Sequence, residues 1–453
     1  MRVVDDNRFK MLFDSPLRYA YPDGSAPGIN DSSRAKLGGW QTMNYDYALL
    51  RYGDPNYAPI VNNSTRQLHL SQSIYFPTHY FETLPEPAVL TFGSTVFDNL
   101  GYAITRAPNV FALMDYGQHG GTHGHYDKLN LILFGQGAQK GDELGGEPKF
   151  HRYEEALHSE WTTQTVAHNT MAVDQSSQIA TTGKLLVFED APTIKVMRGQ
   201  SDSAYAGVLL DRTVVTVDGA VLDLYHGASA LEHSWDRTLR FAGDLNGMPA
   251  ATDEKLGASA GYQHLQVAAR RDATAGWQGV WQTGAGPLQV NVVGAPSQQL
   301  VLAKGPDGDD IALARQRGKT ADFAIVYRLD AWGKAPENLR LVPLKNANVT
   351  AFEMTQDGAK TQVWVAYSEG AWEALGWKSD ARVLVVQTRG DETQIVLGGG
   401  SFAGNGKTEL RQNVAGNYQA TGRDGALKVV AEWTPPAMPT GASAPRARGG
   451  EKN

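Results

Sequence analysis

Short apolar runs separated by turn residues recur along most of this 453-residue chain, and they constrain its fold more than any other feature. From about residue 92 the runs alternate with Gly, Asp and Asn, and several alternate apolar with polar residues, as in TVVTVDGAVLDLYH and TQVWVAYS. This period of two is typical of antiparallel strands, whereas βαβ units would insert helical patterns. We therefore predict a mainly β fold with a large antiparallel β-sandwich of two stacked sheets.

The first 90 residues have a helix-and-loop pattern instead. The stretch SSRAKLGGWQTMNYDYALLRYG spaces its large apolar residues as a helix does, with Asp31 or Ser32 as the expected N-cap. Before it, YPDGSAPGINDS contains two prolines and two glycines, which predict a loop. The apolar faces of such helices need partners that this short segment barely supplies. We expect the segment to be the end of a larger helical domain.

These patterns divide the chain into three parts. We expect a helical remnant over 1–90, the antiparallel sandwich over 91–434 and a tail over 435–453. The tail, PPAMPTGASAPRARGGEKN, is rich in Pro, Ala and Gly and has few residues to bury, so it is predicted to be disordered.

Composition excludes several classes of function. The chain has no cysteine, which rules out disulfides, thiolate metal sites and a cysteine nucleophile. Its 41 Lys and Arg against 48 Asp and Glu give a net charge of −7, so neither nucleic acid nor an anionic membrane is expected as a partner. No apolar run reaches the roughly 18 to 20 residues of a membrane helix, and the N-terminus shows no apolar signal core. Compartment and oligomeric state, a homodimer included, stay open.

Histidine is distributed unevenly, since six of 11 lie between residues 119 and 168: His119, His123, His125, His151, His158 and His168. In an extended HGH segment, His123 and His125 share one face, and Gly124 allows a close approach. Zinc takes about four ligands, commonly three protein groups and water. The nearby candidates for further ligands are Asp127, Asp142, Glu143 and His168.

Two neighbouring strands would bring Asp142 and His168 back beside His125. This set, with one open position, is a suitable zinc shell. The alternative is a group of surface or hydrogen-bonding histidines in β-turns. For Lys128, an ion pair with Asp127 is favoured over a catalytic role, because nothing indicates a lowered pKa.

Two blocks carry a family resemblance. The run DYGQHGGTHGHYDKLNLILFGQGAQKGDELGG, followed by TVAHNTMAVDQSSQ, resembles the heparinase II/III-like polysaccharide lyases, a group that includes the oligo-alginate lyases. Upstream, MLFDSPLRYAYPDGSAPGINDS and FDNLGYAITR are also similar to that family, closest to its alginate-lyase branch. Together the matches cover about residues 10 to 180, and they are more specific for the family than for a substrate.

The resemblance implies an incomplete α/α toroid joined to the sandwich, with an acidic polysaccharide or oligosaccharide bound in the cleft between them. It implies a structural zinc on His125, Asp142 and His168. It places His123 in the cleft, where it helps to neutralise the uronate carboxylate or shuttles a proton. Tyr153 matches roughly the position of a cleft tyrosine, with ordinary packing as the alternative.

Other residues have weaker assignments. Arg106 is a candidate to bind a substrate carboxylate, against a structural ion pair. His226 and His233 either border the cleft or are core and surface residues. In the family, an Asn-His pair and the principal tyrosine base lie upstream of the PDG…INDS segment, so we expect weak or absent activity from this chain alone.

The resemblance therefore predicts a lyase that cleaves uronate glycans by β-elimination, with alginate or oligo-alginate as the leading substrate; exolytic and endolytic action both stay open. Periplasmic or secreted location is favoured by the same resemblance. The alternatives are a non-catalytic carbohydrate-binding or scaffold sandwich with a structural zinc, and a hydrolase that uses zinc-bound water.

Overall fold

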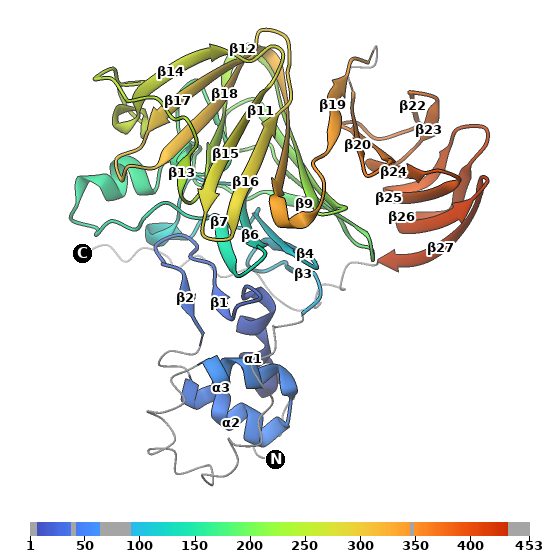
Figure 1. The fold of residues 1–453 in the computed structure, drawn as a ribbon, viewed down its shortest axis with the longest axis horizontal. Coiled ribbons are helices and arrows are strands. Elements are labelled where there is room, and N and C mark those ends of the chain that lie inside the picture. The colour runs from blue at the N-terminus through green and yellow to red at the C-terminus, as the bar shows by residue number, and fades with distance from the viewer. Residues whose placement is uncertain (1–6, 38–41, 64–91, 345–347, 434–453) are drawn as a thin grey trace, which may run out of the picture.

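The computed structural model describes residues 7–37, 42–63, 92–344 and 348–433. Three large antiparallel sheets make up most of the described chain, and helices gather at its N-terminal end (Figure 1). The predicted mainly β, antiparallel architecture is therefore confirmed. The tail expected to be disordered, 435–453, lies outside the described residues. None of the described helices has both the length and the apolar character needed to cross a membrane.

The helices α1 (Asn7–Tyr19), α2 (Thr42–Tyr52) and α3 (Ala58–Asn63) form a small unit at one end of the sheets (Figure 1). They share an apolar core of their own, which includes Leu17, Tyr45, Leu49, Tyr57 and Ile60. A short 3₁₀ turn, Pro55–Tyr57, joins α2 to α3.

The expected N-cap at Asp31 or Ser32 is wrong, because α2 begins only at Thr42. Strands β1 (Ser25–Ala26) and β2 (Ala35–Lys36) form a short ribbon before it, and Asp31 lies in the loop between them. The Ser32 hydroxyl accepts from the Ile29 amide at 2.9 Å and donates to the Ile29 carbonyl at 2.8 Å. These local bonds stabilise a turn where the sequence predicted a helix start.

A five-stranded meander follows the helices. Its strands are β3 (Thr95–Phe97), β4 (Tyr102–Ala107), β5 (Val110–Asp115), β6 (Asn130–Gln136) and β7 (Gly141–Gly145), in that spatial order. The sequence between β7 and the next strand, β8 (Met171–Val173), holds three of the six clustered histidines: His158 lies in a short helical turn, His168 caps another, and His151 precedes both.

The central sheet has 11 strands. Two long strands, β12 (Ala220–Arg240) and β18 (Asp310–Leu329), pair with each other along most of their length, and the register shifts between Ala228 and His233. Around them lie β8, β9 (Lys184–Asp190), β10 (Ile194–Ser201), β11 (Val208–Val217), β13 (Asp244–Leu245), β14 (Gln266–Asp272), β15 (Trp277–Thr283), β16 (Gly286–Val292) and β17 (Gln299–Lys304).

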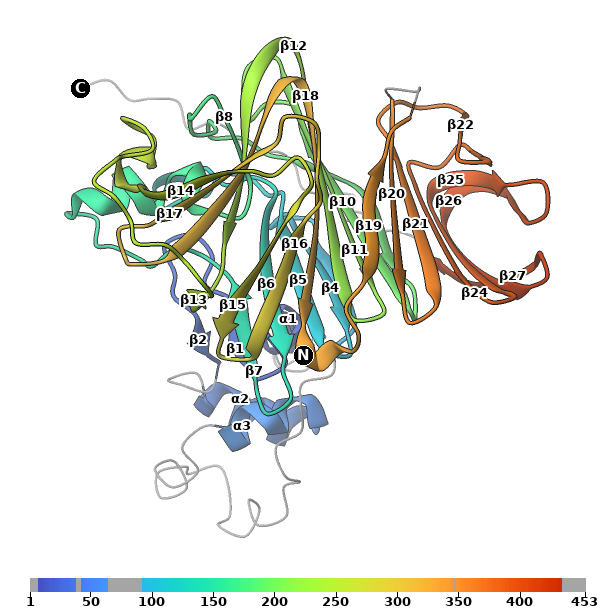
Figure 2. The same ribbon diagram turned by 45° about the horizontal axis from the view of Figure 1, so that its top comes forward.

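The C-terminal sheet has nine strands and curls beside the central sheet (Figure 2). They are β19 (Glu337–Val342), β20 (Val349–Gln356), β21 (Ala359–Ala366), β22 (Trp372–Ala374), β23 (Trp377–Ser379), β24 (Val383–Arg389), β25 (Glu392–Gly404), β26 (Glu409–Arg423) and β27 (Ala426–Trp433).

The sheets stack in three layers where the sequence predicted two. Successive residues of the central strands point to opposite faces. Val214 packs in the core shared with the five-stranded sheet, and its neighbour Val215 packs in the core shared with the C-terminal sheet. Both faces of the central sheet are therefore apolar, which explains the nearly continuous apolar runs in its strands.

Candidate active site and metal centre

The loop between α1 and α2 is fastened to the five-stranded sheet by charged and aromatic side chains. The Arg34 guanidinium contacts Asp142 at 2.5 Å and Asp23 at 2.7 Å. The Tyr21 hydroxyl donates to Glu143 at 2.5 Å. These bonds hold the Asn30–Asp31 part of the loop over the histidine-rich turns of the sandwich, where the Asn30 side chain accepts the amide hydrogen of His125 at 3.0 Å.

Three buried side chains converge beneath this loop. His125 Nδ1 lies 2.9 Å from Glu147 Oε2, and His168 Nε2 lies 2.8 Å from the same oxygen. The two ring nitrogens are 3.1 Å apart, and each of the three side chains is at most 5% exposed. Ligands bound about 2.0–2.1 Å from a tetrahedral zinc ion lie roughly 3.3 Å from one another. The arrangement therefore fits a divalent metal ion.

Further contacts fix which nitrogen of each imidazole faces the centre. His168 Nδ1 donates to the Gln164 carbonyl at 2.9 Å, and His125 Nε2 lies 3.2 Å from Asp31 Oδ1. Such outer partners select the tautomer that leaves the other nitrogen free to bind metal. The Asn130 amide donates to Glu147 Oε1 at 3.0 Å and orients that carboxylate in the same way.

Asp142, predicted as the third metal ligand, does not join this cluster, and Glu147 occupies the position instead. Asp142 lies within β7 and its carboxylate is bound by Arg34. Glu147 follows the end of β7 after two glycines, and from there it reaches both His125 and His168. The spacing of the sequence indicated the correct region. It could not distinguish Glu147 from Asp142 and Glu143, because the carboxylate that reaches the histidines depends on where β7 ends.

The other two carboxylate candidates are also engaged elsewhere. Glu143 accepts from Tyr21, as described above. The buried Lys128 ammonium contacts Asp127 at 3.4 Å and Asp115 at 3.1 Å. The predicted ion pair of Lys128 with Asp127 is therefore confirmed, and it is a buried pair with a second acidic partner.

The predicted cleft residues His123 and Tyr153 lie together at the surface. His123 Nδ1 is 2.8 Å from the Tyr153 hydroxyl and 3.2 Å from Asp31 Oδ2. The His123 side chain is 67% exposed and Tyr153 is 55% exposed, so both are open to a ligand. Partial burial, together with the hydrogen bond to the Asp31 carboxylate, raises the pKa of Tyr153.

The HGH segment is not fully extended, in contrast to the prediction. Residues 121–123 form a 3₁₀ turn, and only Gly124 is extended. A Cβ atom on Gly124 would lie 2.4 Å from the Gly120 backbone nitrogen, so this position requires glycine. The turn leaves His123 exposed and His125 buried, and the two rings meet only through Asp31.

Asp31, like Glu147, is a candidate site residue that the sequence did not predict. Besides His123 and His125, its carboxylate contacts His158 Nε2 at 2.9 Å. Burial alone raises the pKa of the Asp31 carboxyl, but the hydrogen bonds from these three histidines outweigh burial and lower it. The ionised carboxylate thus connects a candidate metal ligand to the exposed His123–Tyr153 pair. The INDS motif was the available signal, and we interpreted it as a helix cap.

Arg106, predicted to bind a substrate carboxylate, is held within the protein. Its Nη2 donates to the carbonyls of Arg18 at 2.9 Å and Ala20 at 2.6 Å, and its guanidinium lies over the Phe111 ring. Burial lowers its pKa to about 10. These contacts attach the end of α1 to β4. Arg106 was predicted either to bind a substrate carboxylate or to form an ion pair, but its hydrogen-bond partners are backbone carbonyls.

Substitution of Asp31 tests its outer-shell role. We expect Asp31→Asn to weaken zinc affinity about 10- to 100-fold, because loss of an outer partner of a metal-bound histidine typically has an effect of that size. Asp202→Asn is the control and should leave the affinity unchanged, because Asp202 is an exposed carboxylate that pairs with Lys184. Competition with a chromophoric chelator measures both. Equal weakening in the two variants would contradict the arrangement.

Comparison with known proteins supports the family resemblance. Residues 90–247 match the family model described as "Heparinase II/III-like, C-terminal". The segment that carries HGHYDKLN and AHNT is thus a heparinase II/III-like C-terminal region. An alginate lyase of Stenotrophomonas maltophilia is 26% identical over 306 residues, which cover 60% of this chain and 37% of that protein. An exo-oligoalginate lyase of Saccharophagus degradans is 28% identical over 169 residues, or 32% of this chain and 23% of that protein.

Solved structures share the fold. A heparinase III superposes with a TM-score of 0.58 at 13% identity, covering 80% of this chain and 52% of that protein. A heparan sulfate lyase of Pedobacter heparinus gives a TM-score of 0.56 at 15% identity, with 79% and 53% covered. At this identity the likeness concerns the fold alone. The chain spans less than two thirds of the length of each of these relatives.

Proposed function

We propose that this chain contributes the sandwich half of the active site in a polysaccharide lyase that cleaves uronate glycans by β-elimination, with alginate or oligo-alginate as the substrate. The observation that carries the proposal is the exposed His123–Tyr153 pair, 2.8 Å apart and joined to the buried Asp31. Its heparinase II/III-like sequence context and the two alginate-cleaving relatives support the substrate class.

The reaction needs a proton acceptor, a proton donor and a partner for the carboxylate. A base from the other half of the active site takes the C5 proton, the electron pair of the C5–H bond forms the C4–C5 double bond, and the C4–O bond breaks as the leaving oxygen takes a proton. The Tyr153 hydroxyl is exposed and lies beside His123, so it is placed to donate that proton. His123 contacts the uronate carboxylate, which stabilises the charge that develops at C5, or carries a proton to and from Tyr153.

Zinc is proposed as a structural ion on His125, Glu147 and His168. A bound ion would add a fixed positive charge that holds the turns carrying these ligands in place. Asp31 extends this order to the surface, because it contacts His125 on one oxygen and His123 on the other. The exposed pair is thereby oriented by a rigid, buried group.

The lyase proposal is tested by following the ultraviolet absorbance of the unsaturated product. The protein is incubated with alginate, oligo-alginate, heparin, heparan sulfate and hyaluronan, and we expect the absorbance to rise on alginate or its oligomers first. The same assay is run on the full product of the gene that encodes this chain. No rise on any glycan with either protein would refute the proposal, and uronate binding without product would favour a non-catalytic carbohydrate-binding sandwich.

A further inference from the structure

A cavity away from the Asp31 cluster is lined by residues of the central sheet and of strands β19 and β20 of the C-terminal sheet. Its volume is about 630 Å³, within the roughly 300–1,000 Å³ range of small-molecule sites. The central sheet contributes its polar lining from β12 and β18. The walls are apolar and include Pro296, Leu341 and Pro343.

A fixed imidazole forms part of this lining. His226 stacks on Tyr367 with ring centroids 3.8 Å apart, and its Nδ1 donates to Asp322 at 2.9 Å. Thr350 donates to the same carboxylate oxygen at 2.9 Å. The His226 side chain is only 8% exposed, and its Nε2 has no hydrogen-bond partner among the described residues. The cavity thus contains a rigid polar atom that is available to a ligand hydroxyl.

A cationic side chain also lines the cavity. Arg317 is exposed, and within the described part of the chain its guanidinium forms no ion pair. The acidic residue of the lining, Asp322, is already bonded to His226 and Thr350. The available charge in the cavity is therefore positive, and a guanidinium is well suited to bind a carboxylate with two parallel hydrogen bonds.

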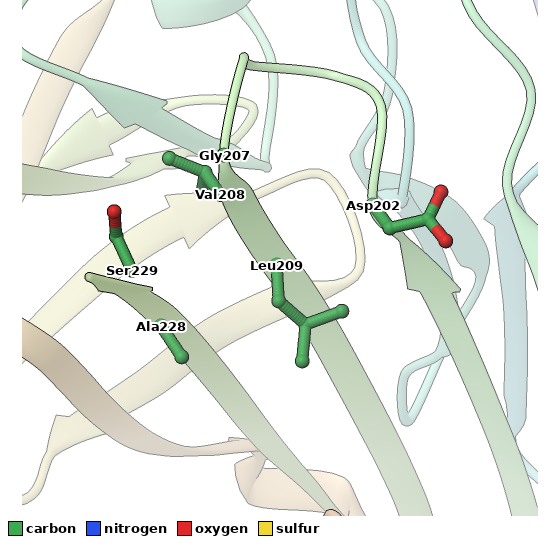
Figure 3. A pocket seen from close by; sticks show the side chains of 6 residues that line it. All are labelled: Asp202, Gly207, Val208, Leu209, Ala228 and Ser229. Carbon is green, nitrogen blue, oxygen red and sulfur yellow. The ribbon is translucent and has the colours of Figure 1, made fainter.

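A smaller cavity, where β11 begins beside β12, lacks this combination. It has a volume of about 380 Å³ and is lined by Asp202, Gly207, Val208, Leu209, Ala228 and Ser229 (Figure 3). None of these six residues is cationic, and Asp202 pairs with Lys184 at 3.2 Å. The smaller cavity is therefore not expected to bind an anion. The Arg317 cavity differs from it by having an arginine in its lining.

We propose that the Arg317 cavity is a second saccharide site that binds a uronate of one or two sugar residues. The carboxylate pairs with Arg317, a ring hydroxyl donates to or accepts from His226 Nε2, and the C–H face of the sugar packs on Pro296 and Pro343. The choice of a uronate over other small carboxylates rests on the proposed function. The binding of a carboxylate rests only on the cavity.

The probe is D-glucuronate, with D-glucose as the ligand of equal ring size that lacks the carboxylate. Calorimetric titration of the whole chain should give a Kd in the millimolar range. Arg317→Ala should weaken glucuronate binding about tenfold or more, because the charge-assisted pair is lost. Lys319→Ala is the matched control, since Lys319 is an exposed cation two residues along β18 that does not line the cavity. It should bind as the unmodified chain does.

His123→Ala separates this site from the proposed active site. Glucuronate binding that persists in His123→Ala and weakens in Arg317→Ala supports the cavity. Binding that is lost in His123→Ala and unchanged in Arg317→Ala overturns it, as does equal binding of glucose. Lyase activity without any Arg317-dependent binding refutes this site and leaves the proposed function intact. Arg317-dependent binding of glucuronate supports the site whether or not this chain shows lyase activity, and the absorbance assay decides the lyase proposal separately.

Discussion

Replacing Tyr153 by phenylalanine is expected to lower the turnover number on a uronate glycan about 10²- to 10⁴-fold, the usual contribution of a positioned proton donor. The variant removes only the hydroxyl, which lies 2.8 Å from His123 Nδ1. The ring contact of Tyr153 with His158, at a centroid distance of 4.8 Å, stays in place. The effect should therefore appear in kcat more than in KM.

Tyr205→Phe is the control for the loss of a tyrosine hydroxyl. Tyr205 donates to the Ser176 carbonyl at 3.0 Å and does not contact Asp31 or the candidate metal ligands. Its removal should leave turnover within about twofold, as expected of a group that is not part of the reaction. Because His123 and Tyr153 act as one unit, the double variant should be scarcely slower than either single one. Fully multiplicative losses would contradict a shared role.

Glu147→Ala is expected to remove most bound zinc from the purified protein. Outer partners typically change metal affinity by about 10- to 100-fold, and loss of a direct ligand should exceed that range. The loss also leaves His125 and His168 facing each other at 3.1 Å without the carboxylate between them. Elemental analysis should give close to one zinc per unmodified chain and far less for the variant.

Asp142→Ala tests whether Asp142 or Glu147 is the carboxylate ligand of the metal. Because the structure pairs Asp142 with Arg34, this variant should keep its zinc, although it weakens the attachment of the Asn30–Asp31 loop. Zinc that is lost from Asp142→Ala and retained by Glu147→Ala would reverse the assignment. Zinc content that stays low in the unmodified chain, and does not change in His168→Ala, would refute the metal centre itself.

Periodic features of the sequence predicted the fold well. Alternation in runs such as TVVTVDGAVLDLYH identified antiparallel strands, and β11 and β12 form there. The number of layers could not be predicted, because the pattern of a strand does not show which other sheet covers each of its faces. The predicted helix cap was wrong because a short polar side chain stabilises a turn as well as it caps a helix, and Asp31 lies in the loop between β1 and β2.

Some residues of the candidate site could be predicted from the sequence and others could not. His123, His125, His168 and Tyr153 were identified from local motifs, and the structure brings them to one place. Glu147 and Asp31 were not, because their roles depend on where a strand ends and on which loop folds over the sandwich. Asp31 lies 92 positions before His123, a separation that no local pattern reveals.

The most direct test of the lyase account is the mass of the products released from a defined oligo-alginate. Elimination leaves a C4–C5 double bond at each new non-reducing end, so every such fragment lacks one water relative to the hydrolysis product. We predict that all new non-reducing ends formed by the complete gene product carry this deficit, and that Tyr153→Phe forms them far more slowly. Fragments that have gained water at each cleaved bond would contradict the account and indicate a hydrolase.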